Sequence, residues 1–336
     1  MKRNASNIIN PAKLAIIRDY LKRFPDHGNQ TIAKAVYKNN PGLWPDAEAV
    51  RSQVRKITGS AGKGHGHLAD PKLARNNGVT GAPPMPKSLA SNWDSYALTS
   101  RRILVVSDIH IPYHDDSAVE SMMRHAAELN PDCILLNGDI IDFFSVSKWE
   151  SNPAFRNIVK EIEGTKAFLA HINARFPKAK LIYKKGNHEE RLDFYIWRKC
   201  PELWGMPNLK LEHVLELENL KCELVEDQRI IKAGKLSILH GHEFPRGMSS
   251  PVNPARGYFM RGHECVLAGH YHRTSEHTEP TMLGRSVTTW SAGCLCGLHP
   301  EYARLNKWNH GFAFVELDKD GGFRVQNFRI RNGKVL

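Results

Sequence analysis

Five short clusters of carboxylate, amide and imidazole side chains lie between residues 108 and 272. In chain order they are Asp108-Ile109-His110, Gly138-Asp139-Ile140-Ile141-Asp142, Gly186-Asn187-His188-Glu189, His240-Gly241-His242 and Gly269-His270-Tyr271-His272. These ligand types suit borderline divalent cations such as manganese, iron, zinc and nickel. A single histidine or aspartate is more often structural, but five such clusters in one stretch of chain indicate a metal-dependent active site.

The elements around these clusters are predicted to bring them together. Short apolar runs precede the first three clusters and read as buried strands: 103–106, 133–136 and 181–183. Helices are expected between them over 117–129 and 155–175. Strands that alternate with helices form a partly parallel sheet, so the clusters meet at one edge, where α/β proteins bind ligands. Later strand-like segments have no helices between them and predict a second, more antiparallel sheet: 236–239, 265–268, 286–291 and 312–317.

In these motifs and their order, over roughly residues 102–336, the chain resembles the calcineurin-like metallophosphoesterase superfamily. The resemblance implies an α/β fold of the αββα type, a two-sheet sandwich with two metal ions at its rim. It implies that one ion is bound by Asp108, His110, Asp139 and His272. The other ion is then bound by Asp139, Asn187, His240 and His270, so that Asp139 bridges the pair. Manganese is the expected metal, with iron, zinc or nickel as the alternatives.

The chemistry that the resemblance implies is hydrolysis of a phosphate ester. A shared carboxylate holds two cations roughly 3.5–4 Å apart, where they acidify water and polarise the phosphoryl oxygens. The family pattern leaves His188 without a metal, so this residue is expected to donate a proton to the leaving oxygen. Asp142 is expected behind His188, where it fixes the tautomer; a helix N-cap is its alternative role. His242 and His114 are either supporting residues of the site or ordinary loop histidines.

One departure from the family pattern bears on the substrate. The protein phosphatase branch has an arginine directly after the second cluster, where it grips the phosphate, and here that position is Phe143. The departure argues against a protein phosphatase. Together with Phe144 and Trp149, Phe143 either stacks on a nucleobase or packs the loop against the body. Arg191 and Arg246 follow two of the clusters and either contact phosphate or form salt bridges.

The overall composition is that of a globular chain. Of the 336 residues 41% are hydrophobic, and no apolar run reaches the roughly 18 residues that a membrane span needs. No apolar segment of a signal peptide follows the charged N-terminus, so a cytoplasmic protein of a bacterium or a phage-infected host is expected. Cys294 and Cys296 form a C-x-C pair without a second pair, which is a poor zinc site. Reduced thiols are therefore expected.

The formal net charge of +12 is concentrated in residues 1–63, which hold twelve lysines and arginines against four acids. Capping residues and helical spacing predict three short helices in this segment. The first begins at Asn10-Pro11, the second covers about 31–38, and the third follows Pro45-Asp46. The sequence therefore predicts a small, basic, helix-turn-helix-like module.

The third of these helices carries Arg51, Arg55 and Lys56 close together. These side chains either contact nucleic-acid phosphates or form a protein-docking or merely solvated face. A flexible linker over 64–100 is expected to join the module to a catalytic domain at 101–336. This layout, with Phe-Phe-Ser-Val-Ser at 143–147 and His188-Glu189-Glu190-Arg191, also resembles proteins carried by bacteriophages and prophages.

The preferred function is two-metal hydrolysis of a phosphodiester in a nucleic acid or nucleotide. A phosphomonoesterase that acts on a small molecule or a protein is the alternative enzyme. A nucleic-acid-binding protein with an inactive phosphoesterase fold is the alternative from another class.

Overall fold

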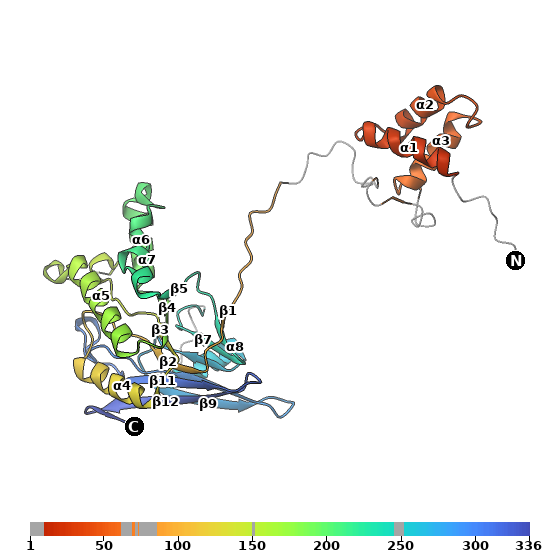
Figure 1. Cartoon of the computed structure of the whole chain (residues 1–336). Helices are drawn as coiled ribbons and strands as arrows, with labels where there is room; N and C mark the ends of the chain where they lie inside the picture. Colours follow the sequence, from red (N-terminus) through yellow and green to blue (C-terminus); the bar gives the residue numbers. More distant parts are fainter. Residues whose placement is uncertain (1–9, 62–68, 71–72, 74–85, 150–151, 245–251) are drawn as a thin grey trace. The chain divides into compact units, whose positions relative to one another are not determined.

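The computed structural model describes residues 10–61, 69–70, 73, 86–149, 152–244 and 252–336 (Figure 1). The chain divides into two compact units, Met1–Ala90 and Ser91–Leu336. None of the described helices is long and apolar enough to cross a membrane.

Three helices make up most of the described part of the first unit: α1 Pro11–Arg23, α2 Asn29–Asn39 and α3 Ala47–Ile57. The side chain of Asn10 caps α1 by accepting a hydrogen bond from the N–H of Ala12, and Pro11 takes the first helical position. Asp46 caps α3 through the N–H of Ala49. One apolar face of each helix enters a common core: Ile17, Leu21, Ile32, Val36, Val50, Val54 and Ile57.

The first unit extends past residue 63, where the sequence placed its end. Leu73 packs against the helical core. The N–H of Asp70 donates to the carbonyl of Ile57, and the Asp70 carboxylate forms an ion pair of 3.1 Å with Arg18. These contacts join residues that are distant in the chain, so they could not be predicted from a local sequence pattern. Most of the predicted linker, including residues 74–85, lies outside the described residues.

The second unit combines two sheets with helices. The helices are α4 Asp116–Leu129, α5 Ile158–Arg175, α6 Glu190–Lys199, α7 Leu211–Val214 and α8 Pro254–Gly262. Within the described residues, one sheet has seven strands in the order β13 Lys334–Val335, β12 Phe323–Arg331, β11 His310–Leu317, β2 Arg102–Val106, β3 Cys133–Asn137, β4 Lys180–Lys184 and β5 Glu223–Val225. The other has six, in the order β1 Tyr96–Leu98, β6 Ile231–Ala233, β7 Leu236–Leu239, β8 Val266–Ala268, β10 Ser286–Ser291 and β9 Ser275–Pro280.

The seven-stranded sheet has a parallel part and an antiparallel part. Strands β2, β3, β4 and β5 run parallel to one another, with Val106 opposite Leu136. β11 pairs antiparallel with β2, placing Ala313 opposite Val105, and β12 returns beside β11. In the six-stranded sheet β7 and β8 are also parallel. Because parallel strands end at the same edge, the loops after them can meet there.

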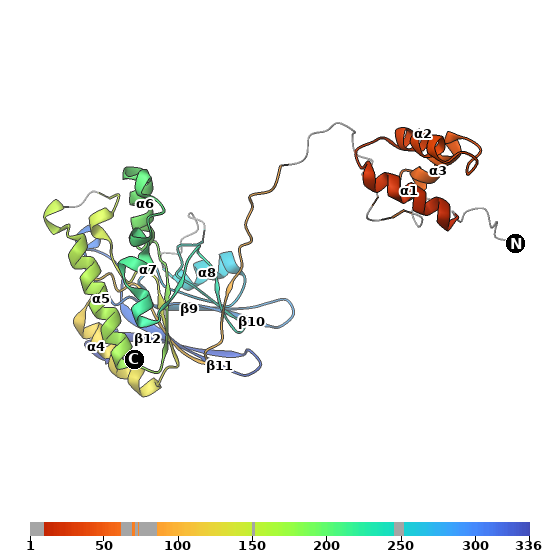
Figure 2. The same ribbon diagram turned by 45° about the horizontal axis from the view of Figure 1, so that its top comes forward.

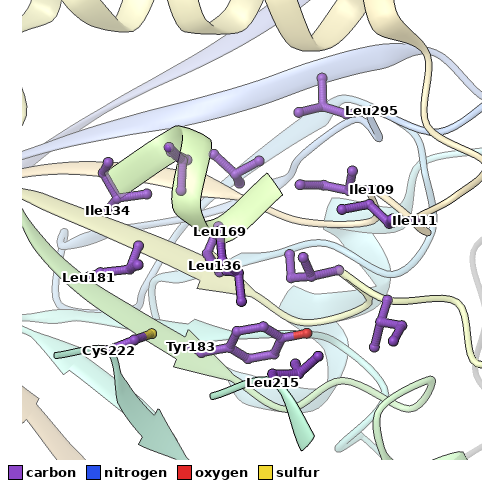
Figure 3. Packing of buried hydrophobic residues seen from close by; sticks show 14 of the residues in the cluster. Ile109, Ile111, Ile134, Leu136, Leu169, Leu181, Tyr183, Leu215, Cys222 and Leu295 are labelled. Atoms are coloured by element: carbon purple, nitrogen blue, oxygen red, sulfur yellow. The ribbon is translucent and has the colours of Figure 1, made fainter. Parts of the chain in front are cut away.

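The two sheets pack face to face, and helices cover their outer faces. Along β2, Leu104 and Val106 enter the core shared with α4 and α5, whereas Ile103 and Val105 enter the core between the sheets. Tyr258 of α8 packs on the outer face of the six-stranded sheet. Figures 1 and 2 show α4 and α5 along one side of the sandwich, and Figure 3 shows the core under α5. The predicted αββα sandwich is confirmed.

The second unit begins at Ser91 rather than at residue 101, which corrects the predicted linker of 64–100. Strand β1 pairs in parallel with β6, with Tyr96 opposite Ile231. Before it, the indole N–H of Trp93 donates to the carbonyl of Asp227 at 2.8 Å. β1 has three residues, which is too short for an alternating pattern to be recognised in the sequence.

Candidate metal centre

Every predicted metal ligand lies in a loop that directly follows a strand. Asp108 and His110 follow β2, Asp139 follows β3, Asn187 follows β4, His240 follows β7, and His270 and His272 follow β8. The loops converge, and among the described residues ligand atoms within 4.8 Å of one another form four overlapping groups, two of which consist only of predicted metal ligands. One of these two groups is Asp108, His110 and Asp139, and the other is Asp139, His240 and His270. Asp139 belongs to both groups, as a bridging ligand must.

Beside the first group, the imidazole ring of His272 presents the same nitrogen to His110 as His110 presents to it. The Nε2 atoms of His110 and His272 lie 3.2 Å apart, and His272 Nε2 lies 3.1 Å from Asp108 Oδ1. His110 Nδ1 donates to Asp142 Oδ2 at 3.0 Å, which leaves Nε2 of the neutral ring with a lone pair. The lone pair of His110 Nε2 thus faces His272 Nε2, and the Asp108 carboxylate lies beside them. This arrangement suits the binding of one cation by all three side chains.

Beside the second group, the buried Oδ1 atom of Asn187 has no hydrogen-bond partner among the described residues. His240 Nδ1 donates to the carbonyl of Asn137 at 2.8 Å, so its Nε2 faces the centre, where it lies 3.2 Å from Asp139 Oδ2. A buried polar atom without a partner is costly. Its presence beside a buried carboxylate fits a site built for a metal.

The electrostatics of the group favour positive charge. Burial alone would raise the pKa of the Asp139 carboxyl, but the histidines around it, His188 and His240 first, hold this pKa well below its usual value. Burial would lower the pKa of His240, but the Asp139 carboxylate raises it to about 10. Burial and the neighbouring His240 lower the pKa of His270 to about 3. The carboxylates thus stay ionised and attract a proton or a cation.

Five of the seven predicted ligands have a left-handed backbone. Their φ angles are 57° for Asp108, 54° for His110, 55° for Asp139, 69° for His270 and 55° for His272. Residues other than glycine rarely adopt this conformation, which costs of order 1–3 kcal/mol and concentrates at functional sites. The strain turns each side chain out of its strand direction toward the common centre.

Glycines make room for the ligands. Gly138 has φ +87°, and a Cβ atom built there would lie 2.6 Å from His240 Nδ1. A Cβ atom at Gly186 would collide with Asp139 Oδ1, and one at Gly269 would collide with Ser107 Oγ and Asp108 Oδ2. The glycines that precede the ligands in the sequence motifs are therefore required for close approach of the loops.

Glu189 organises two of the loops, a role that the sequence analysis missed. Its buried carboxylate accepts hydrogen bonds from the N–H groups of Asp139 at 2.9 Å, Ile140 at 2.8 Å and Gly186 at 2.7 Å. It also accepts from the Tyr183 hydroxyl at 2.7 Å. Glu189 ends the third cluster, so its position was a signal; its partners became apparent only in the fold.

A buried ion pair supports the His240 loop. Lys184 Nζ lies 2.9 Å from Glu243 Oε1, and the lysine side chain is fully buried. Glu243 accepts from the N–H of His240 at 3.0 Å and from the N–H of Gly241 at 2.6 Å. Although burial would raise it, Lys184 and the nearby histidines lower the pKa of Glu243 to about 2. The pair thus joins the end of β4 to the loop after β7.

His188 faces the centre, and Asp142 lies behind it. Its Nε2 lies 3.7 Å from Asp139 Oδ2. Its Nδ1 donates to the backbone carbonyl of Asp142 at 2.8 Å, whereas the Asp142 carboxylate hydrogen-bonds to His110. The Asp142 carboxylate also lies 3.5 Å from His188 Nδ1, so Asp142 contacts His188 through both its main chain and its side chain. Arg191 joins them, donating to Asp142 Oδ1 at 3.1 Å and approaching His188 Nε2 at 2.8 Å.

The three predicted aromatic residues have separate positions. Phe143 is fully buried in the helical-side core, so it packs the loop and does not stack on a ligand. Phe144 lies edge-on to Tyr113, with 5.7 Å between ring centroids. Trp149 is 65% exposed. The substitution of arginine by Phe143 is thus explained by core packing.

Other singled-out residues lie around the centre. His242 Nε2 lies 3.3 Å from Glu190 Oε1, and His114 Nε2 lies 3.2 Å from Asp116 Oδ1. Cys294 and Cys296 are buried free thiols, and Cys296 Sγ lies 3.9 Å from His272 Nδ1. Cys296 thus stands behind a predicted ligand, a position that C-x-C spacing did not suggest. Arg246 lies outside the described residues.

Comparison with known sequences identifies relatives of this chain. The sequence model of the calcineurin-like phosphoesterase family matches residues 101–274. The gene 54 protein of Mycobacterium phage D29 is 27% identical over 232 residues, which are 65% of this chain and 90% of that protein. The gene 54 protein of Mycobacterium phage L5 is 24% identical over 233 residues, with the same coverage of 65% and 90%.

Solved structures also match the chain. Vacuolar protein sorting 29 from Cryptosporidium parvum has a TM-score of 0.38 and 14% identity, covering 70% of this chain and 95% of that one. A dimetal phosphatase from Danio rerio has a TM-score of 0.36 and 11% identity, covering 70% of this chain and 98% of that one.

Proposed function

Because the chain belongs to the calcineurin-like phosphoesterase family, we propose that it hydrolyses a phosphodiester of a nucleic acid or nucleotide with two divalent cations. Membership of the family makes it a metal-dependent hydrolase of phosphate esters. What we propose beyond family membership is that the substrate is a diester, that it belongs to a nucleic acid or nucleotide, and which residues carry out the reaction.

The proposed ligand sets follow the two groups of side chains. Asp108, His110, Asp139 and His272 hold one cation, and Asp139, Asn187, His240 and His270 hold the other. Manganese is the first choice for a set of carboxylate, amide and imidazole donors, with iron, zinc or nickel as alternatives. When bound, the cations polarise the phosphoryl oxygens and acidify the attacking water. The position of Asp139 in both groups, beside the unpartnered Oδ1 atom of Asn187, is the observation that carries this proposal.

His188 and Arg191 supply the protein's own chemistry in this proposal. The hydrogen bond from His188 Nδ1 to the Asp142 carbonyl fixes the ring, so that Nε2 faces the centre. In this structure Nε2 accepts a hydrogen bond from Arg191, so for Nε2 to donate a proton to the leaving oxygen the imidazole first takes up a second proton and the Arg191 N–H moves to the substrate. Arg191, whose Nη2 lies 2.8 Å from that Nε2, binds a phosphoryl oxygen at the same place.

The space around the centre favours a diester. A cavity of about 540 Å³ is lined by Asn187 and His270, and another of about 390 Å³ is lined by His110. The two cavities thus adjoin ligands proposed for different cations. A diester has two substituents on phosphorus and needs room on both sides, whereas a monoester needs room for one.

The test compares bis-p-nitrophenyl phosphate with p-nitrophenyl phosphate, using the full-length protein with Mn²⁺ and a chelator control. We expect a higher kcat/KM on the diester and loss of hydrolysis with the chelator. A higher kcat/KM on the monoester would favour a phosphomonoesterase. Hydrolysis of neither ester with Mn²⁺, Fe²⁺, Zn²⁺ or Ni²⁺ would favour the inactive, nucleic-acid-binding alternative.

For the first unit we propose nucleic acid as the partner of α3. Arg51 pairs with Glu48 at 3.1 Å, and Arg55 donates to the Ser60 carbonyl at 3.1 Å. These are exposed contacts of low energy, which phosphate oxygens can replace. Lys56 follows on the same helix and adds a third positive charge.

A further inference from the structure

The two cavities beside the metal centre differ in chemical character. The first, called here the basic pocket, is lined by Arg191, Arg198, Arg261 and Lys148 against a single carboxylate, that of Glu190. Within the described residues neither Arg198 nor Arg261 pairs with a carboxylate, and Arg198 Nε donates to the carbonyl of Phe194 at 2.8 Å. Two guanidinium groups without a carboxylate partner, beside a site for phosphate chemistry, are suited to a further phosphate group.

The second cavity, called here the aromatic pocket, has no lysine or arginine in its lining. Its walls include five aromatic rings: Tyr113, Phe144, Phe155, Tyr302 and Trp308. The Trp308 ring lies 6.3 Å from the Tyr302 ring, and its other neighbour is His272 at 4.1 Å between centroids. A pocket of about 390 Å³ with ring walls and no cation suits a flat uncharged aromatic group and disfavours a phosphate.

A cleft connects the two pockets and passes the proposed proton donor. This cleft of about 680 Å³ is lined by His188. It shares Phe144 and Tyr302 with the aromatic pocket, and Lys148 and Arg191 with the basic pocket. A bound chain molecule can therefore run from one pocket to the other with its phosphorus beside His188.

We propose that the substrate is a single-stranded nucleotide chain that places one nucleobase in the aromatic pocket and the next phosphate in the basic pocket. The scissile phosphate lies between them, at the cations. This inference rests on the proposed function and adds to it an unpaired substrate strand and a fixed orientation. Base stacking on aromatic rings is tolerant of sequence, so the site reads the presence of a base and not its identity.

Tyr302 allows the aromatic pocket to be tested without disturbing the fold. It is 68% exposed, and Trp204, at 55% exposure and outside this pocket, serves as the control. The substrates are a dinucleoside phosphate and the same diester without its bases. Tyr302→Ala should raise KM roughly tenfold on the base-containing diester, because stacking of one base is lost. The KM on the base-free diester should stay unchanged, Tyr302→Phe should restore the parent value, and Trp204→Ala should have no effect.

A binding measurement keeps this test independent of turnover. In the presence of Mn²⁺, thymidine 5′-monophosphate should bind more tightly than deoxyribose 5-phosphate, and Tyr302→Ala should abolish the difference. If the enzyme hydrolyses no diester but this difference in binding is seen, the proposed function is wrong and the assignment of the aromatic pocket to a nucleobase is supported. If diesters are hydrolysed but bases affect neither KM nor binding, the pocket assignment is wrong and the proposed function stands.

The basic pocket is tested by the double variant Arg198→Ala/Arg261→Ala. Its matched control is Arg285→Ala/Arg324→Ala, which removes two arginines outside the pockets around the centre. The first variant should weaken binding of a short single-stranded oligonucleotide and lower its log–log salt slope by about 0.7, the value for one phosphate contact on a single strand. An equal change in the control variant would overturn the proposal.

Discussion

Asp139 lies between the two groups of ligands. Its Oδ2 is 3.2 Å from His240 Nε2 and 3.9 Å from His110 Nε2, while Oδ1 accepts the N–H of His188 at 2.9 Å. Asp139→Asn should therefore lose most bound metal and most activity together, because a neutral amide cannot bridge two cations.

Elemental analysis of metal per chain, measured beside turnover, checks this expectation. Asp320→Asn changes an exposed carboxylate and should leave both quantities at the parent values. Two retained ions with nearly full turnover in Asp139→Asn would show that Asp139 does not bridge.

His188 is predicted to act on the leaving group without holding metal. His188→Ala should keep the metal content and slow hydrolysis by about 10²–10⁴-fold, the usual contribution of general acid catalysis. The loss should shrink for esters with acidic leaving groups, since these depart without a proton. A series of aryl diesters measures this dependence, and an equal loss across the series would remove His188 from the role.

The loops that follow the strands depend on glycine. Gly138→Ala combines a left-handed backbone with a Cβ atom 2.6 Å from His240 Nδ1. Gly284 has a similar φ of +77° but nothing within 4 Å of its Cβ position, so Gly284→Ala measures the backbone effect alone. That effect should cost about 1–2 kcal/mol in the free energy of unfolding.

Gly138→Ala should cost clearly more than Gly284→Ala and should also weaken metal binding. Urea denaturation of both variants and metal titration by calorimetry provide the comparison. Equal destabilisation by the two substitutions would mean that the loops move apart freely and that their close approach is not needed.

Local patterns accounted for many of these elements. Strand β10 occupies the predicted residues Ser286–Ser291, and the predicted helix of 117–129 is α4, Asp116–Leu129. Such elements could be predicted because apolar runs and caps are properties of neighbouring residues. The ligand clusters were visible for the same reason, since each combines a glycine, an acid or a histidine within a few positions.

What could not be predicted depends on contacts between distant residues. The carboxylate of Asp142 is shared between His110 at 3.0 Å and His188 at 3.5 Å, and the Asp142 carbonyl also accepts from His188. Lys184 at the end of β4 pairs with Glu243 after β7, and Glu189 binds the loop after β3. Burial of Phe143 in the core likewise follows from packing against helices that the sequence does not place.

At the scale of the whole molecule, the two units should be separable. Deleting residues 1–90, which keeps β1 in the catalytic unit, should leave hydrolysis of bis-p-nitrophenyl phosphate almost unchanged, because the centre lies wholly in Ser91–Leu336. Oligonucleotide binding should weaken, and its salt dependence should flatten. Arg51, Arg55 and Lys56 together account for a slope change near 2.7 on duplex DNA, at roughly 0.9 per phosphate contact.

The triple variant Arg51→Ala/Arg55→Ala/Lys56→Ala should reproduce most of this loss of binding without altering the rate on the small diester. Lys13→Ala/Lys22→Ala/Lys34→Ala removes the same charge from α1 and α2 and serves as the control. Unchanged affinity and slope in the first variant would indicate a protein partner for α3.

Strand β2 lies between β3 and β11, which is encoded near the other end of the chain. During translation, residues 102–106 leave the ribosome long before residues 310–317. Until the later segment emerges, one edge of β2 has no strand to pair with and presents open N–H and C=O groups. The open edge of β2 can therefore pair with other chains during most of the synthesis of this protein. A chaperone bound to β2 in that interval would block such pairing.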